Sequence, residues 1–133
     1  MVSRWYKLTF SLEETSEHGG GDIYIGDLLT WEMTRLTHEG DLYDASWAPT
    51  RNLIAYTKMK MEVWPRVRVL HIMRADGNCP IEVPDIGEVR DFSWSPDSEK
   101  IAFVFDGVVY EIDLLKVFGE VFLSENWPCP EVE

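Results

Sequence analysis

The sequence predicts an all-β fold built from repeated, four-stranded antiparallel sheets, and two observations carry this prediction. The first is an internal repeat, in which residues 44–49 (DASWAP) recur as residues 91–96 (DFSWSP), 47 positions later. Residues 53–56 (LIAY) and 100–103 (KIAF) match at the same offset, so the segment between the two matches keeps its length. The second observation is that short apolar segments alternate with turn residues, while no segment shows sustained helical periodicity. We therefore take the repeat as the structural unit.

Local residue preferences predict the strands of the middle unit. Pro49 lacks the N–H that a continuing ladder needs, so it ends a first strand over residues 43–47. Residues 66–74 alternate in side-chain type, as expected of a strand whose two faces differ. The Asp-Gly pair at 76–77 predicts a tight turn, because glycine readily adopts a positive φ. The remaining strands of this unit are predicted over residues 52–58 and 81–83.

The outer units are predicted by comparison with the middle one. In the third unit we expect strands over residues 89–94, 100–105, 108–114 and 120–124. In the first unit we expect strands over residues 6–12, 22–28 and 31–37, without the opening strand that carries the Ser-x-x-Pro signature. Residues 114–117 are too short a stretch to indicate a helix. The prediction is therefore about eleven strands, at four per complete unit.

Units of this length, each with four antiparallel strands, are typical of β-propeller blades. The words SWSPD at 93–97 and KIAF at 100–103 resemble the blade motif of TolB-like propellers, which are related to WD40 repeats. The resemblance covers nearly the whole chain and is strongest in the third unit. In the first unit it is limited to residues 22–28 and 35–37, which look like the D-I-Y-x-x-D-L and R-x-L-T words of that family. We expect one domain over residues 1–133, with an incomplete blade at about 4–40, blades at about 41–87 and 88–124, and a tail at 125–133.

The repeated residues are expected to form the framework of the blades. The two serines are small enough for the innermost strands to crowd around an axis, and the two tryptophans are large enough to cover the seam between blades. The two prolines end a strand and begin a turn. These framework residues are Ser46, Trp47, Pro49, Ser93, Trp94 and Pro96.

About three blades are too few for a closed propeller, which needs at least about four. An open arc exposes two blade faces, and exposed apolar faces mark interfaces. We therefore expect two copies to join around a two-fold axis as a six-bladed homodimer. The tail, through Trp127, is expected to supply the missing strand to the partner chain; the alternative is a tail packed on its own surface. The chain could equally be a piece of a longer propeller.

The composition limits the partners and the location. The formal net charge of −12 repels phosphate backbones and anionic membranes, so we expect neither nucleic acid nor membrane as a partner. The sequence has no secretory apolar stretch and no run long enough for a membrane span, so a cytoplasmic location is expected. Cys79 and Cys129 both neighbour a proline, and whether they pair stays open.

The sequence carries no recognisable catalytic or cofactor motif. It has neither a nucleophile elbow nor a phosphate-binding loop, and its three histidines are not at metal-ligand spacing. We therefore expect a non-enzymatic protein- or peptide-binding or scaffolding module, without cofactor or metal. The alternative is a small enzyme with its site in the central channel.

The candidate binding residues lie on loops, which a rigid scaffold can present to a partner. Two connections are longer than a hairpin needs, at residues 13–21 and 58–65, and both are expected to project from the same end. The second is rich in the Trp and Met side chains that suit adaptable interfaces. The predicted site residues are Met59, Met61 and Trp64 on this loop, together with His38 and Asp41 between the first two blades.

Overall fold

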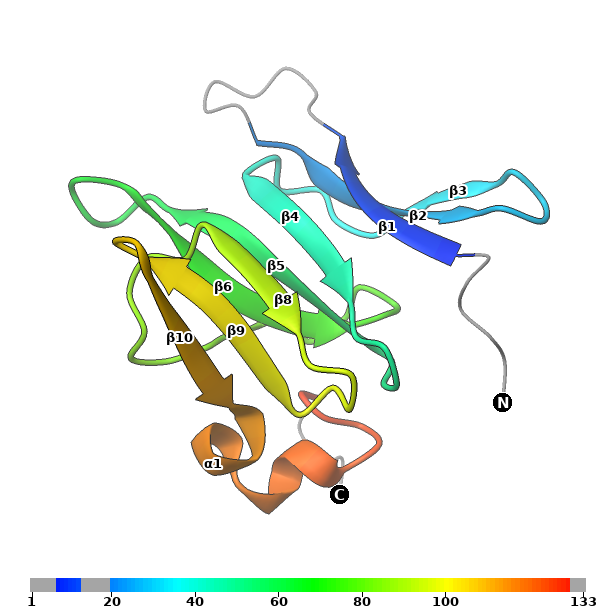
Figure 1. Cartoon of the computed structure of the whole chain (residues 1–133). Coiled ribbons are helices and arrows are strands. Elements are labelled where there is room, and N and C mark those ends of the chain that lie inside the picture. Colours follow the sequence, from blue (N-terminus) through cyan, green and yellow to red (C-terminus); the bar gives the residue numbers. More distant parts are fainter. Residues whose placement is uncertain (1–6, 13–19, 130–133) are drawn as a thin grey trace.

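Three separate antiparallel sheets stand side by side in chain order (Figure 1). The structure is a computed structural model that describes residues 7–12 and 20–129. The first sheet, in the order β1-β2-β3, contains β1 (Lys7–Leu12), β2 (Asp22–Asp27) and β3 (Met33–Arg35). The second contains β4 (Leu42–Trp47), β5 (Leu53–Lys60), β6 (Val67–Arg74) and β7 (Ile81–Glu82), in that order. The third, in the order β10-β9-β8, contains β8 (Asp91–Trp94), β9 (Lys100–Phe105) and β10 (Val108–Asp113). The predicted all-β fold is confirmed.

The internal repeat appears in space as one stacked pair of rings in each sheet. Each pair joins directly opposed residues of two neighbouring strands, with ring centroids 5.5–5.8 Å apart. The pairs therefore identify β1, β5 and β9 as corresponding strands, and likewise β2, β6 and β10. By this correspondence, and over the described residues, the first sheet has no opening strand and the third has no fourth strand. The paired residues are Phe10 with Tyr24, Tyr56 with His71, and Phe103 with Tyr110.

Two apolar cores fill the seams between neighbouring sheets. The first seam is centred on Ile23, Ile54 and Tyr56, all of which are buried. The second and larger seam contains Trp94, whose indole Nε1 donates a hydrogen bond to the carbonyl of Ser46 in the neighbouring sheet at 3.1 Å. This seam is therefore held by a polar contact as well as by buried apolar area.

The segment that follows β10 is helical, so the predicted strand over residues 120–124 is wrong. It folds as α1 (Leu114–Phe118) and a 3-10 turn, η1 (Glu120–Leu123). The side chain of Asp113 accepts a hydrogen bond from the backbone amide of Lys116 and caps α1. Leu114 and Phe122 are fully buried, so both turns fold back over the second seam. Capping and burial therefore outweigh the four-strand period here.

The tail, including Trp127, packs against its own chain, and its exchange with a partner chain stays a prediction. Trp127 is only 6% exposed and lies edge-on against the rings of Phe118 and Phe122. A disulfide between Cys79 and Cys129 joins the tail to the turn that precedes β7. The ring contacts and the disulfide both attach the tail to its own chain, and the indole of Trp127 fills a core position.

Candidate functional site

The connection between β5 and β6, residues 61–66, presents the most exposed tryptophan of the described chain. Trp64 is 86% exposed, and Val63 beside it is also exposed. The two strands that carry this connection pair continuously from Leu53 opposite Arg74 to Lys60 opposite Val67. The loop therefore lies at the tip of a long, regular hairpin, at the same end of the blades as the β9–β10 turn (Figure 1).

The structure brings only some of the predicted site residues together. Asp41 lies beside Met59, whose backbone amide donates to the Asp41 carbonyl at 3.1 Å. Met59 and Met61 are half-buried at the base of the connection. His38 is exposed and lines a separate hollow of about 190 Å³. In the described part of the chain, no hydrogen bond or ion pair joins Trp64 to His38 or to Asp41. Most of the other long loop, residues 13–19, lies outside the described residues.

The framework residues lie where the sheets meet or turn. Trp94 is buried in the second seam, while Trp47 is partly buried against the first. Ser46 is half-buried, and its counterpart Ser93 is exposed. Pro49 and Pro96 are both exposed and follow the ends of β4 and β8.

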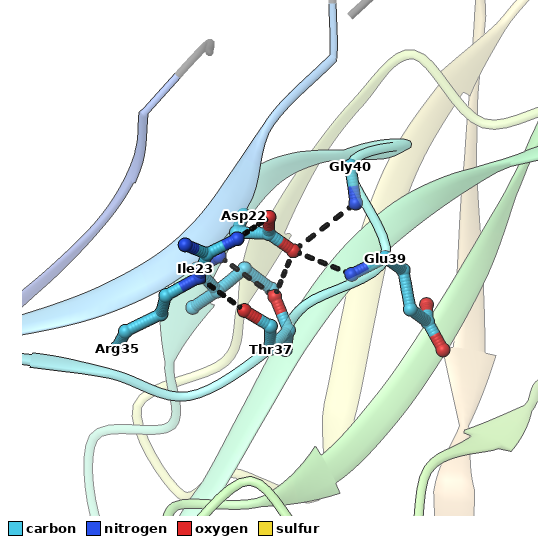
Figure 2. A network of polar contacts seen from close by, with 6 residues as sticks. All are labelled: Asp22, Ile23, Arg35, Thr37, Glu39 and Gly40. Carbon is cyan, nitrogen blue, oxygen red and sulfur yellow. Dashed lines mark hydrogen bonds and ion pairs between the residues drawn. The ribbon is translucent and has the colours of Figure 1, made fainter.

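A buried carboxylate that the sequence analysis did not single out organises the linker between the first two sheets (Figure 2). The Asp22 side chain is 4% exposed and accepts from the Arg35 guanidinium and the Thr37 hydroxyl, both at 2.7 Å. It also accepts from the backbone amides of Glu39 and Gly40, at 2.8 and 3.1 Å. One side chain at the start of β2 therefore fixes residues 37–40, the segment that carries His38.

The network sets the ionisation of Asp22. Burial alone would raise its pKa, because the charged form loses water. Hydrogen bonds from Thr37, the Gly40 amide, Arg35 and the Glu39 amide stabilise the charged form and together hold the pKa of Asp22 below its ordinary value. Asp22 is therefore an ionised structural anchor. The only signal in the sequence was the pair of family-like words at 22–28 and 35–37, whose polar residues this network joins.

At the end of the blades opposite the Trp64 loop, the tail and the turns of two sheets surround a hollow of about 780 Å³. The guanidinium of Arg51 lies 4.0 Å from the centre of the Phe122 ring and donates to the Phe122 carbonyl. Arg74 donates to the side chain of Asn126 at 2.7 Å. Arg51 and Arg74 both contact the segment that follows β10, so the hollow lies where this segment is attached to the sheets.

Within residues 7–12 and 20–129, no group of three or more His, Cys, Asp or Glu side chains could hold a metal ion. Over the same ranges, no helix is long and apolar enough to cross a membrane.

The comparisons with known proteins concern the fold. No family model matches the sequence, and no curated protein does. Among solved structures, a TolB structure from Agrobacterium tumefaciens superposes with a TM-score of 0.64 at 20% identity, over 82% of this chain and 42% of that one. TolB from Acinetobacter baumannii superposes with a TM-score of 0.65 at 18% identity, over 85% of this chain and 28% of that one.

These likenesses show that the chain folds as blades of a TolB-like β-propeller. The chain spans less than half the length of either TolB structure. At this identity the likeness shows the fold, and function has to be argued from the chain's own residues.

Proposed function

We propose that the chain is a protein- or peptide-binding module whose contact surface includes the β5–β6 connection. The observation that carries this proposal is Trp64, an indole exposed at 86% on the connection between two regular eight-residue strands. A large aromatic side chain on a rigid support is the kind of residue that dominates binding energy at interfaces. The TolB-like fold supports the same general role, since propeller blades hold such loops in place.

Trp31 offers a matched control for Trp64. It is 82% exposed, and it lies in the β2–β3 turn, a connection from a third to a fourth strand at the other end of the blades. We would select binders from a displayed random-peptide library and measure their affinity by fluorescence anisotropy. Loss of a central aromatic contact costs about 2 kcal/mol, so Trp64→Ser should weaken binding about thirtyfold while Trp31→Ser changes it less than about twofold. Equal effects of the two substitutions, or no selected binder, would refute the proposal.

The alternative of a small enzyme finds no support among the described residues. Arg68 and Asp44, for example, form an ion pair at 3.7 Å, and the described residues contain no group of three or more His, Cys, Asp or Glu that could hold a metal ion. A piece of a longer propeller is compatible with the partial coverage of both TolB structures. In that case Trp64 would serve the same binding role within a larger ring.

We also propose that two copies associate through the open face of the third sheet. Ala102, Val104 and Val109 are exposed there, whereas the corresponding residues of the second sheet are buried under the third. The face is only partly apolar, because an ion pair between Lys100 and Glu111, at 3.2 Å, occupies the positions of Leu53 and Ile72. Burying these charges would cost free energy. We therefore expect a weak dimer.

For the location of the protein, the disulfide leads to a different proposal from the cytoplasmic one that the sequence favoured. We infer an oxidising compartment, because the Cys79–Cys129 bridge connects residues 50 positions apart and attaches the tail. Such structural disulfides persist where thiols are not kept reduced.

A further inference from the structure

Among the described residues, no strand pairs with the outer edge of β10, whereas its counterparts have such a neighbour. The stacked ring pairs show that β10 corresponds to β2 and β6. In their sheets β2 is followed by β3 and β6 by β7, whereas β10 is the edge of the order β10-β9-β8. The segment that would continue the third sheet is instead folded into α1 and η1. The edge is thus a vacant fourth-strand position (Figure 1).

One backbone carbonyl marks this position in all three sheets. Ile23, Leu70 and Val109 each directly precede the third-strand member of the ring pair. The amide of Leu36 donates to the Ile23 carbonyl at 2.8 Å, and the amide of Val83 donates to the Leu70 carbonyl at 2.9 Å. Over the described residues, no corresponding amide donates to the carbonyl of Val109.

The geometry of the β9–β10 hairpin directs this carbonyl outward. Phe105 and Val108 are opposed across a two-residue turn, which makes them a hydrogen-bonded pair. Bonded and non-bonded pairs alternate along an antiparallel ladder, so the backbone groups of Val109 and Glu111 point away from β9. An extended segment laid along β10 would meet them in register.

The side chains along β10 define the chemistry of the missing strand. Val109 is 70% exposed, whereas its counterpart Leu70 is fully buried. Apolar contact beside Val109 is therefore open to a partner. Asp106, Glu111 and Asp113 outnumber Lys100, which pairs with Glu111 at 3.2 Å, so the hairpin is net acidic in a chain of net charge −12. A second copy would bring the same charges to the edge, whereas a cationic segment would be attracted to it.

We propose that the edge of β10 binds an extended peptide segment of another protein, with an apolar residue beside Val109 and lysine or arginine two residues further along, on the same face as Glu111. Binding occurs by strand addition, in which main-chain hydrogen bonds supply affinity and alternate side chains supply specificity. This surface is separate from the Trp64 loop, and the inference holds whether or not that loop binds a partner.

Three labelled synthetic heptapeptides test the inference on the full chain by fluorescence anisotropy at low salt. The first carries valine and lysine two residues apart with threonine between them, so that both face the side of Val109 and Glu111. The second has glutamate in place of lysine, and the third is the lysine peptide with alternate backbone amides methylated. We expect the first to bind and the second to bind at least about tenfold more weakly, because of its charge. The third should also lose at least about tenfold, because methylation removes the donors to the edge.

Two variants of equal charge locate the site. Val109→Lys places a cation on the edge and should weaken binding of the lysine peptide about tenfold or more. Val121→Lys, on the exposed η1 residue Val121, adds the same charge elsewhere and should change binding less than about twofold. Circular dichroism checks that both variants fold. Equal binding of the methylated peptide, equal effects of the two variants, or a concentration-dependent dimer that occupies the β10 edge and excludes the peptides would each overturn the inference.

Discussion

Removing the carboxylate of Asp22 should destabilise the chain more than any comparable change of an exposed acid. Asp22→Ala deletes an acceptor that holds four donors at 2.7–3.1 Å, and it leaves the Arg35 guanidinium and the Thr37 hydroxyl without that partner. Hydrogen bonds to a charged group contribute about 1.5–3 kcal/mol each, and they are not additive within one network. We therefore expect a loss of about 3 kcal/mol in the free energy of unfolding. For a chain of this size, the melting temperature should fall by roughly 10 °C.

The conservative substitution Asp22→Asn separates charge from shape. It keeps one acceptor oxygen but replaces the other with an amide donor that faces the donors of the linker, so about 2 kcal/mol should be lost. Asp27→Asn, in the same strand, is the matched control. Among the described residues, the Asp27 oxygen accepts from the exposed amides of Leu29 and Thr30, which an asparagine can also serve, so the cost should stay below about 0.5 kcal/mol.

The pH dependence gives a second readout of the same carboxylate. The pKa of Asp22 is lower in the folded chain than in the unfolded one, so its contribution to stability is complete above the unfolded value. That contribution is lost as the pH falls through the folded value. The stability difference between wild type and Asp22→Asn should therefore shrink below about pH 4. Urea denaturation across this range measures it. A difference that is independent of pH, or equal losses for Asp22→Asn and Asp27→Asn, would show that the network does not anchor the linker.

Two further predictions concern the tail and the open face. Replacing Cys79 and Cys129 together by serine should lower the free energy of unfolding by at most about 4 kcal/mol, because the bridge closes a loop of 50 residues. Urea denaturation measures this loss, and an unchanged midpoint would contradict the role given to the bridge. Light scattering should give a mass near 15.4 kDa at low concentration that rises at high concentration. The double substitution Lys100→Leu with Glu111→Ile, which restores the residues of the second sheet, should strengthen this association, and a mass independent of concentration in both chains would refute the dimer.

The strands were predictable wherever the sequence repeats itself. The match at a constant offset placed β4 and β8, and then β5 and β9, in corresponding positions, because the same strand and turn preferences act twice. Failures begin where the repeat ends. The segment after β10 was predicted as a strand, but the capping side chain of Asp113 and the burial of Phe122 make it helical. The Asp113 cap is a local contact that the four-strand period overrode in the prediction, whereas the burial of Phe122 depends on a core shared with another sheet, which periodicity could not reveal.

The candidate site was harder to predict than the fold, for a related reason. Trp64 could be selected from sequence because a long loop with an aromatic residue is conspicuous locally. The role of Asp22 depends on four donors that lie 13 to 18 residues further along the chain. A single aspartate carries no local sign of such partners. The contacts of the tail within the chain were also not predicted: two aromatic side chains pack on Trp127, and a disulfide attaches the segment that follows it.

The covered face of the second sheet and the open face of the third sheet differ chemically, and this difference bears on how the chain meets its partners. Where the second sheet is covered, its face carries Leu53 and Ile72; where the third sheet is open, the same positions carry Lys100 and Glu111. Terminal repeats of stacked proteins need a polar outer face to stay in solution. The third sheet has a polar outer face at Lys100 and Glu111. Val109, however, is exposed, and over the described residues no further strand pairs with the backbone of β10. A surface of this kind resists the stacking of another apolar sheet but accepts a narrow extended strand. The edge is therefore a better site for a peptide than the face is for a second copy.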